Sequence, residues 1–398
     1  MNIWLVNQYA IPPTGQGGAR HHNLALELSR RGHDVTILAS PVSYITGRAA
    51  PGLDGIQDAG SGVRFRWIRS PDYRGNSIGR VWNMVVFAAR LLRRKWTAEL
   101  PAPDVILGSS PHLFAAYAAA RLAERWQVPF VMEIRDLWPE TLITVGRFSE
   151  RHPLVQVFRR LERACYRRAR AIVSLLPNAA RYLADYGVDE AKVHWVPNGV
   201  RLAEYAAIAE PASSNERFCV MYAGTHGLAN ALDPIVDAAA LLREPLPNVY
   251  FTFIGDGPAK AGLMARAAHL PNVEFRSSVP RNEVAEVLSE ADAFVISLLD
   301  TPLYQYGISL NKLHEFLAAG RPVVLSGNAP GNPLELAPVG RITPPNDAKA
   351  IADAVAELAR LPASERIAMG RRGRQYAMDH HDFAVLAARY EKALTDEH

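Results

Sequence analysis

The chain has 398 residues, a length that favours two domains over one hydrophobic core. Hydrophobic residues make up 49% of it and charged residues 21%, as in soluble globular proteins, and no run approaches the roughly 18 uncharged apolar residues of a membrane span. The formal net charge is +4, with the arginines clustered mostly in the first half, and two cysteines, Cys165 and Cys219, are too few for a disulfide framework or a cysteine metal site.

The N-terminal segment, residues 1–13, has no basic region before its apolar stretch and ends in two prolines. We therefore expect a strand at 2–7, no signal peptide and a cytosolic protein.

Strand-like and helical patterns alternate along the whole chain, which is the βαβ rhythm of a parallel sheet. In the first half we predict a helix at 18–32 and further strands at 34–40, 104–110, 130–136 and 171–177. A second series follows the polar stretch 210–217, with strands predicted at 219–224, 249–257, 273–279, 293–299 and 322–327. The pattern predicts an α/β protein with two facing, Rossmann-like parallel-sheet domains and a cleft between them.

The predicted domains are residues 1–200 and 201–378, with a C-terminal helix, 379–398, that packs back on the first domain. Open parallel sheets bind ligands outside the carboxyl ends of their strands, where backbone amides and helix N-termini are free. The loops that follow strands are therefore the candidate sites.

The loop after the first strand contains Gly15, Gly17 and Gly18. Glycines let the backbone approach a ligand closely and present free amides at the start of the next helix, which suits an anion. A dinucleotide fingerprint would need a third glycine where Arg20 stands and an acidic residue near Ser40, so NAD is not expected. A glycine-rich turn of purely structural use is the alternative.

The strand predicted at 130–136 ends in charged residues. Alternation sends Glu133 and Arg135 to one face, while Asp136 lies at the carboxyl end, within reach of a substrate hydroxyl. The alternative is a structural salt bridge between Arg135 and a neighbouring carboxylate.

Two loops in the second half have a similar character. Gly224, Thr225, His226 and Asn230 follow a predicted strand and precede a helix, where small residues and hydrogen-bond donors suit a phosphate. Gly255 lies in a comparable loop, which a plain strand-to-helix turn explains equally well. For His226 the alternative is a surface or capping imidazole.

The largely apolar segment 304–324 carries two charges, Lys312 and Glu315, that burial would penalise unless each finds a partner. A helix capped by Ser309 and Asn311 is predicted to begin there. Three residues apart on it, Lys312 and Glu315 share one face. Either this is a solvated helix end with a weak salt bridge, or Glu315 accepts hydrogen bonds from ribose hydroxyls while Lys312 and the helix N-terminus meet phosphate oxygens.

Two basic stretches, 80–96 and 158–170, remain outside these loops. The first mixes aromatic and aliphatic residues with Arg90, Arg93 and Arg94, and it suits an anionic membrane surface. For the second we favour an ordinary amphipathic helix. Nucleic-acid binding is not expected, because no recognised motif and no row of aromatic residues for base stacking accompanies the arginines.

Taken together, these motifs resemble the retaining nucleotide-sugar glycosyltransferases of family GT4, which share the GT-B architecture of two facing Rossmann-like domains. The resemblance covers nearly the whole chain, and the segments that carry it are 17–36, 135–140, 196–200, 254–258, 289–299 and 306–324. The variants at 135–140 and 306–315 look like those of the bacterial subgroup that transfers N-acetyl-L-fucosamine and similar amino sugars in surface polysaccharide assembly.

The resemblance implies a nucleotide-sugar site made from residues already singled out. Gly17 and Gly18 would border the donor diphosphate and the acceptor, the backbone after Gly224 would hold the phosphates, and Glu315 would contact the ribose. The full set of expected donor-site residues is Gly17, Gly18, Gly224, Thr225, His226, Asn230, Gly255, Asn311, Lys312 and Glu315.

The resemblance further implies transfer with retention from a UDP-linked donor to a saccharide on polyprenyl diphosphate, at the inner face of the cytoplasmic membrane. Lys312 would stabilise the departing phosphate, and Arg135 and Asp136 complete the expected catalytic residues. No metal and no cofactor is expected.

The chain also departs from the family. Many members have two glutamates separated by seven residues, and Gly307 stands where the first would lie. An arginine and a lysine common in the loop after residue 223 are replaced by Thr225, His226 and Asn230, so Lys312 is the first candidate to meet the phosphate charge. Two rival functions therefore stay open: a nucleotide-sugar epimerase of GT-B fold, and a membrane-peripheral scaffold that has lost catalysis.

Overall fold

The computed structural model describes residues 1–11, 19–75, 77–210 and 217–395, and the structural statements below concern these residues. The chain forms two compact units, Met1–Pro197 with Phe383–His398, and Asn198–Asp382. Each is described by itself.

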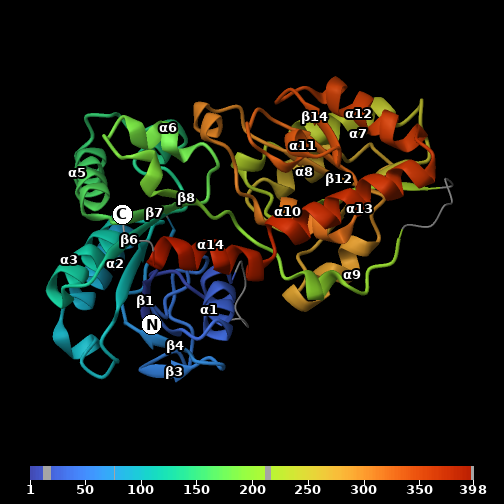
Figure 1. Ribbon diagram of the computed structural model, residues 1–398. Coiled ribbons are helices and arrows are strands. Elements are labelled where there is room, and N and C mark those ends of the chain that lie inside the picture. The colour runs from blue at the N-terminus through green and yellow to red at the C-terminus, as the bar shows by residue number, and fades with distance from the viewer. Residues whose placement is uncertain (12–18, 76, 211–216, 396–398) are drawn as a thin grey trace. The chain divides into compact units, whose positions relative to one another are not determined.

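The first unit is built on an eight-stranded sheet in the order β3-β4-β2-β1-β5-β6-β7-β8 (Figure 1). Every neighbouring pair is parallel except β3 and β4, which are antiparallel. Its strands are β1 (Asn2–Val6), β2 (Asp34–Ala39), β3 (Ile56–Asp58), β4 (Val63–Trp67), β5 (Val105–Ser109), β6 (Phe130–Ile134), β7 (Ala171–Ser174) and β8 (Val193–Trp195).

Helices cover both faces of this sheet (Figure 1). On one face lie α1 (Arg20–Arg30) and α14 (Phe383–Thr395), and on the other α2 (Ile78–Leu91), α3 (Leu113–Trp126) and α5 (Pro153–Arg168). Shorter helices are α4 (Glu140–Thr144) and α6 (Ala179–Ala184). Leu386 and Tyr390 of α14 share one buried cluster with Leu24 and Leu28 of α1, so the C-terminal helix belongs to the core of the first unit.

The second unit contains a six-stranded, wholly parallel sheet in the order β11-β10-β9-β12-β13-β14. Its strands are β9 (Phe218–Ala223), β10 (Val249–Ile254), β11 (Val273–Arg276), β12 (Ala293–Ser297), β13 (Val323–Ser326) and β14 (Gly340–Thr343). Because strand side chains alternate, Val220 and Tyr222 enter one buried cluster and Met221 the other.

One cluster lies under α7 (Asp233–Leu242), α8 (Lys260–Arg266) and α12 (Ala348–Arg360). The other lies under α9 (Val284–Ser289), α10 (Asn311–Ala319) and α13 (Ala363–His380) (Figure 1). A further short helix is α11 (Pro333–Leu336).

The predicted fold class, two α/β units with parallel sheets, is confirmed. The strands β3, β4, β8 and β14 were not predicted. Strands β3, β8 and β14 are short and incompletely buried, so their apolar alternation is weak, whereas β4 alternates apolar residues with Arg64 and Arg66 and was overlooked. No helix in the described part of the chain is long and apolar enough to cross a membrane.

Candidate functional site

The loops after β9 and β10 touch each other through their backbones. Gly224 has φ +146° and Gly255 φ +136°, which side-chain-bearing residues rarely adopt. A Cβ atom on Gly255 would overlap the carbonyl oxygen of Gly224. Next to them, the His226 amide donates to the Asp256 carbonyl at 2.9 Å. Glycine is therefore required at 224 and 255 to bring these two strand-end loops together.

Lys312, in the first turn of α10, reaches across to the end of β9. Its Nζ donates to the hydroxyl of Tyr222 and to Oδ1 of Asn230, both at 2.7 Å, and lies 4.5 Å from the centre of the Tyr222 ring. The Tyr222 hydroxyl and Asn230 Nδ2 each donate to the Thr225 carbonyl at 2.8 Å. A closed hydrogen-bond network thus joins the helix start to the loop after β9.

Both direct hydrogen-bond partners of the Lys312 ammonium are neutral oxygens. Burial lowers the pKa of this amine to about 7, against the smaller opposing effect of Glu315. Gly224 makes room for the amine, since a Cβ there would lie 3.2 Å from Lys312 Cε. A cation held in this way is well suited to an incoming anion.

Glu315 is not the ion-pair partner of Lys312 within the described residues. Its Oε1 accepts from Nη1 of Arg281, and Arg281 Nη2 donates to Oε2 of Glu204 at 3.2 Å. The alternative of a weak salt bridge between Lys312 and Glu315 is therefore wrong. Arg281, which the sequence reading did not single out, is the cation that compensates Glu315.

The start of α10 differs from the predicted cap. The N-cap position is Leu310, and no side chain caps the helix in the part of the chain described. Ser309 instead accepts from the Asn198 amide at 2.7 Å, and Asn198 Nδ2 donates to the Ser309 carbonyl at 2.6 Å. Asn311 is exposed in the first turn. Because no described side chain caps the helix, the first-turn amides of α10 suit an anion.

His226 is buried among the rings of Tyr222, Phe253 and Phe275, with centroid distances of 5.8, 6.4 and 6.1 Å. Burial lowers its pKa, and its ring nitrogens have no hydrogen-bond partner in the described structure. The surface and capping alternatives for His226 are therefore wrong. The ring packs beneath the loop that contains the exposed Thr225.

In the first unit, the end of β6 is organised by a fully buried carboxylate, Glu133. Its Oε1 accepts from Nε and Nη2 of Arg20 at 3.1 and 3.0 Å and from the Tyr390 hydroxyl at 3.3 Å. Its Oε2 lies 2.6 Å from Nε2 of His21 and accepts from the Ser109 hydroxyl. Burial alone would raise the pKa of Glu133, but His21 and Arg20 hold it well below its usual range.

Arg20 extends this network to the end of the unit. Nη2 donates to the Val196 carbonyl at 2.8 Å, and Nη1 donates to that of Pro197. The sequence reading noted Arg20 only as a departure from the dinucleotide fingerprint. A glutamate inside an otherwise apolar strand was the signal that a buried cation had to exist.

Arg135 and Asp136 directly follow β6. The Arg135 amide donates to the Ser110 hydroxyl at 2.9 Å, and its half-buried side chain forms no ion pair with any described residue. The predicted alternative of a structural salt bridge is thus not seen there. Asp136 is exposed. The other first-unit candidates, Gly17 and Gly18, lie outside the described residues.

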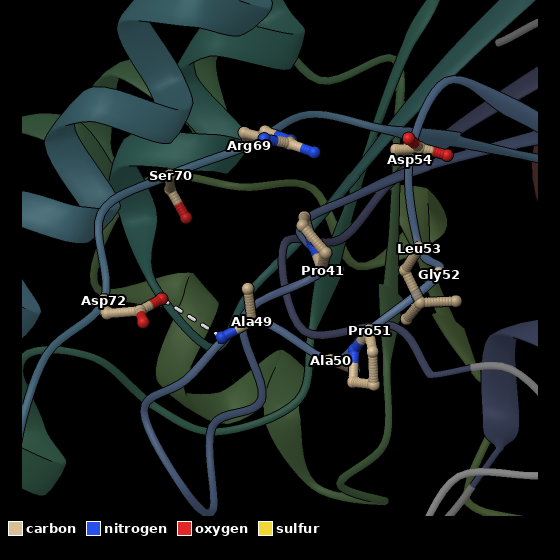
Figure 2. A pocket seen from close by; sticks show the side chains of 10 residues that line it. All are labelled: Pro41, Ala49, Ala50, Pro51, Gly52, Leu53, Asp54, Arg69, Ser70 and Asp72. Carbon is tan, nitrogen blue, oxygen red and sulfur yellow. Dashed lines mark hydrogen bonds between the residues drawn. The ribbon is translucent and has the colours of Figure 1, made fainter.

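A separate cavity of about 390 Å³ lies in the first unit, between the segments that follow β2 and β4 (Figure 2). None of the predicted site residues lines it. Its walls are Pro41, Ala49, Ala50, Pro51, Gly52, Leu53, Asp54, Arg69, Ser70 and Asp72. No group of His, Cys, Asp or Glu side chains able to hold a metal ion occurs in the described ranges.

Two family models match the chain: "Glycosyl transferase 4-like domain" at residues 16–199 and "Glycosyl transferases group 1" at residues 217–360. Together they span both units. The chain belongs to the GT4 family of GT-B glycosyltransferases.

Individual relatives of this glycosyltransferase are distant. WcaI of Escherichia coli K12, named as a colanic acid biosynthesis glycosyl transferase, is 22% identical over 325 residues, 76% of this chain and 77% of its own. Sucrose-phosphate synthase from Thermosynechococcus elongatus has a TM-score of 0.76 at 16% identity, covering 98% of this chain and 97% of that one. Anabaena HepE, solved in complex with UDP, has a TM-score of 0.70 at 14% identity, covering 99% and 100%. At these identities the structural likeness establishes the fold alone.

We predict that the Glu133 network is a main source of stability in the first unit. Glu133→Leu leaves the Arg20 guanidinium buried without its anion and should lower the free energy of unfolding by about 3–5 kcal/mol. The double variant Arg20→Met with Glu133→Leu should lose less, because both charges are gone. Urea unfolding followed by tryptophan fluorescence reports this unit selectively, since all seven tryptophans lie before residue 198.

The matched control is Glu124→Leu in the same unit, which removes the exposed partner of Arg121 and Arg168 and should cost about 0–1 kcal/mol. A loss for Glu133→Leu no greater than for this control would contradict the prediction.

Proposed function

We propose that this glycosyltransferase transfers a sugar, with retention, from a UDP-linked donor to a saccharide carried on polyprenyl diphosphate. The proposed process is lipopolysaccharide, O-antigen or capsule assembly, and the proposed sugar is an N-acetylated amino or deoxyamino sugar. The single observation that carries the donor site is Lys312, whose hydrogen-bond partners among the described residues are neutral oxygens. It lies beside a helix start for which no side-chain cap is described and beside two glycine-containing loops.

The geometry supports a division of labour in donor binding. The diphosphate would lie against the loop around Gly224, Thr225 and Asn230, where the Lys312 ammonium and the α10 amides attract it. Gly255 allows the two strand-end loops to close on one another. Glu315, whose carboxylate is paired with Arg281, would accept hydrogen bonds from the ribose.

The transfer step itself needs little from protein acids and bases. As the bond from sugar to phosphate breaks, Lys312 and the helix dipole stabilise the charge that develops on the leaving phosphate. A phosphate oxygen then takes the proton of the acceptor hydroxyl, which attacks on the same face of the sugar. This proposal assigns the acceptor side to Asp136 and Arg135, with Gly17 and Gly18 bordering the diphosphate as the resemblance implies.

Support for the acceptor class comes from relatives and from the first unit. WcaI carries the name of a colanic acid biosynthesis glycosyl transferase, which favours a polysaccharide product. The cavity in Figure 2 lies at the carboxyl ends of β2 and β4, where open parallel sheets bind ligands. Its walls are mostly apolar, but Asp54, Arg69, Ser70 and Asp72 line it as well and could bind saccharide hydroxyls.

Helix α2 supports a membrane contact. Ile78 and Trp82, one turn apart, are 89% and 59% exposed. The exposed cations Arg93, Arg94 and Lys95 follow the helix. An apolar and aromatic face that ends in cations suits the surface of an anionic bilayer, where a polyprenyl-linked acceptor resides.

The function is tested by incubating the pure protein with a panel of UDP-sugars, with and without a polyprenyl diphosphate saccharide. We expect a new glycolipid only when both substrates are present, with the donor's anomeric configuration kept in its NMR spectrum. A changed UDP-sugar without acceptor would identify an epimerase instead. Nucleotide binding with no product under any condition would identify a scaffold.

We predict that UDP affinity depends on pH through Lys312. Because burial lowers the pKa of this amine to about 7, the ammonium is present below that pH and is lost above it. Calorimetry should show wild-type affinity falling between pH 6 and pH 8.5, and Lys312→Met should bind about 10-fold or more weakly at pH 6, with a flatter profile. Lys349→Met, which removes an exposed surface lysine, is the control. Parallel pH profiles for wild type and Lys312→Met would refute the assignment.

We predict that the basic end of α2 binds anionic membranes. Arg93→Glu with Arg94→Glu should release most protein from sedimented vesicles that contain phosphatidylglycerol, because it replaces attraction by repulsion. The control, Arg371→Glu with Arg372→Glu, makes the same charge change on exposed arginines of α13. Equal loss from both variants would mean that only total charge matters and would count against a specific surface.

A further inference from the structure

Arg281 is the centre of an ion-pair array that no catalytic step described above uses. It begins the 3-10 turn Arg281–Glu283 that follows β11 and lies between two carboxylates from other parts of the chain. Nη1 pairs with Glu315 Oε1, and Nη2 donates to Glu204 Oε2 at 3.2 Å. The buried Tyr205 hydroxyl also interacts with this guanidinium.

The two carboxylates are not equivalent. Both oxygens of Glu204 are occupied, Oε1 by Arg201 and Oε2 by Arg281. Glu315 uses only Oε1, and its Oε2 has no ion-pair or hydrogen-bond partner among the described residues. Its side chain is 16% exposed, so the unused oxygen keeps access to a ligand.

Because Glu204 has both oxygens paired and Glu315 only one, each residue of the array has a different role. Glu204 pairs with Nη2 of Arg281 and fixes the guanidinium, and Arg281 in turn restricts Glu315 to one orientation. A carboxylate whose orientation is already set loses less conformational freedom when it binds, so its hydrogen bond to a ligand hydroxyl contributes more affinity. An exposed, freely rotating glutamate would lack this advantage.

Resting on the proposed function, we infer that Arg281 is a positioning residue that holds Glu315 with its free Oε2 toward a ribose hydroxyl of the nucleotide. The pair would thereby set a preference for ribonucleotides over deoxyribonucleotides. The carboxylate of Glu204 holds Arg281 in place and does not bind the ligand. This role is distinct from that of Lys312, which concerns the phosphates.

The experiment measures, by calorimetry, the binding of UDP, 2′-deoxy-UDP and 3′-deoxy-UDP to wild type, Arg281→Gln, Glu315→Gln and the double variant. Wild type should prefer UDP over at least one deoxy analogue by about 10-fold or more. Arg281→Gln should lose most of that preference while its affinity for the same analogue stays within about threefold. The double variant should lose no more than Glu315→Gln alone, because both act through one hydrogen bond.

Two further variants separate positioning from general effects. Arg281→Lys keeps one cation for Glu315 and should recover part of the preference. Arg341→Gln removes an exposed arginine that pairs with Glu357 elsewhere in the unit, and it should leave all three affinities unchanged. Circular dichroism of each variant checks that the fold is kept.

Several outcomes would overturn the inference. Retention of the full wild-type preference by Arg281→Gln would contradict it, and so would an equal weakening of all three nucleotides, which would indicate a general electrostatic effect. Additive losses in the double variant would show that Arg281 acts independently of Glu315. If wild type binds none of the nucleotides, the donor assignment itself fails and the inference falls with it, a result distinct from normal binding without the predicted preference.

Discussion

Charges that lie inside this protein must each find a partner, and the organisation of both units follows from that constraint. In the first unit the carboxylate of Glu133 is fully buried, so Arg20, His21 and Tyr390 converge on it from α1 and α14. Breaking a buried pair leaves the remaining charge without compensation, which costs far more than an exposed pair contributes. The network therefore ties the helix after the glycine-rich loop, the end of β6 and the C-terminal helix into one arrangement.

The second unit meets the same constraint in a different way. Glu315 has a cationic partner in Arg281, whereas Lys312 is bound by the neutral oxygens of Tyr222 and Asn230. The first arrangement pairs one oxygen of the carboxylate and leaves the other without a partner among the described residues. The second leaves the electrostatic attraction of the lysine unused, which suits the binding of an anion at a helix start. Glycine is needed at positions 224 and 255. A side chain at 255 would push the two strand-end loops apart, and one at 224 would crowd Lys312.

The candidate site could be predicted in part. Its glycines could be singled out from the sequence because they stand in loops after strands, where special backbone conformations are needed. Lys312 and Glu315 could be singled out because they are charges in an apolar segment. Ser309 was misread as a helix cap, since a serine before a helix is a common cap, yet here it binds Asn198, which is 111 residues away in sequence. The alternative of a surface or capping imidazole for His226 was also wrong, because its ring packs among three aromatic rings. Neither error could be detected from neighbouring residues.

The sequence by itself determined the two α/β units with parallel sheets, because side-chain periodicity and turn residues act over a few positions. It also determined which loops follow strands and so lie where ligands bind. Only the tertiary structure decided which charges are partners. Glu133 meets Arg20 across 113 positions, and Lys312 meets Tyr222 across 90. Such pairs depend on the order of the strands in each sheet and on which helices pack against them. The strength of a buried interaction also depends on distances that no local sequence pattern encodes.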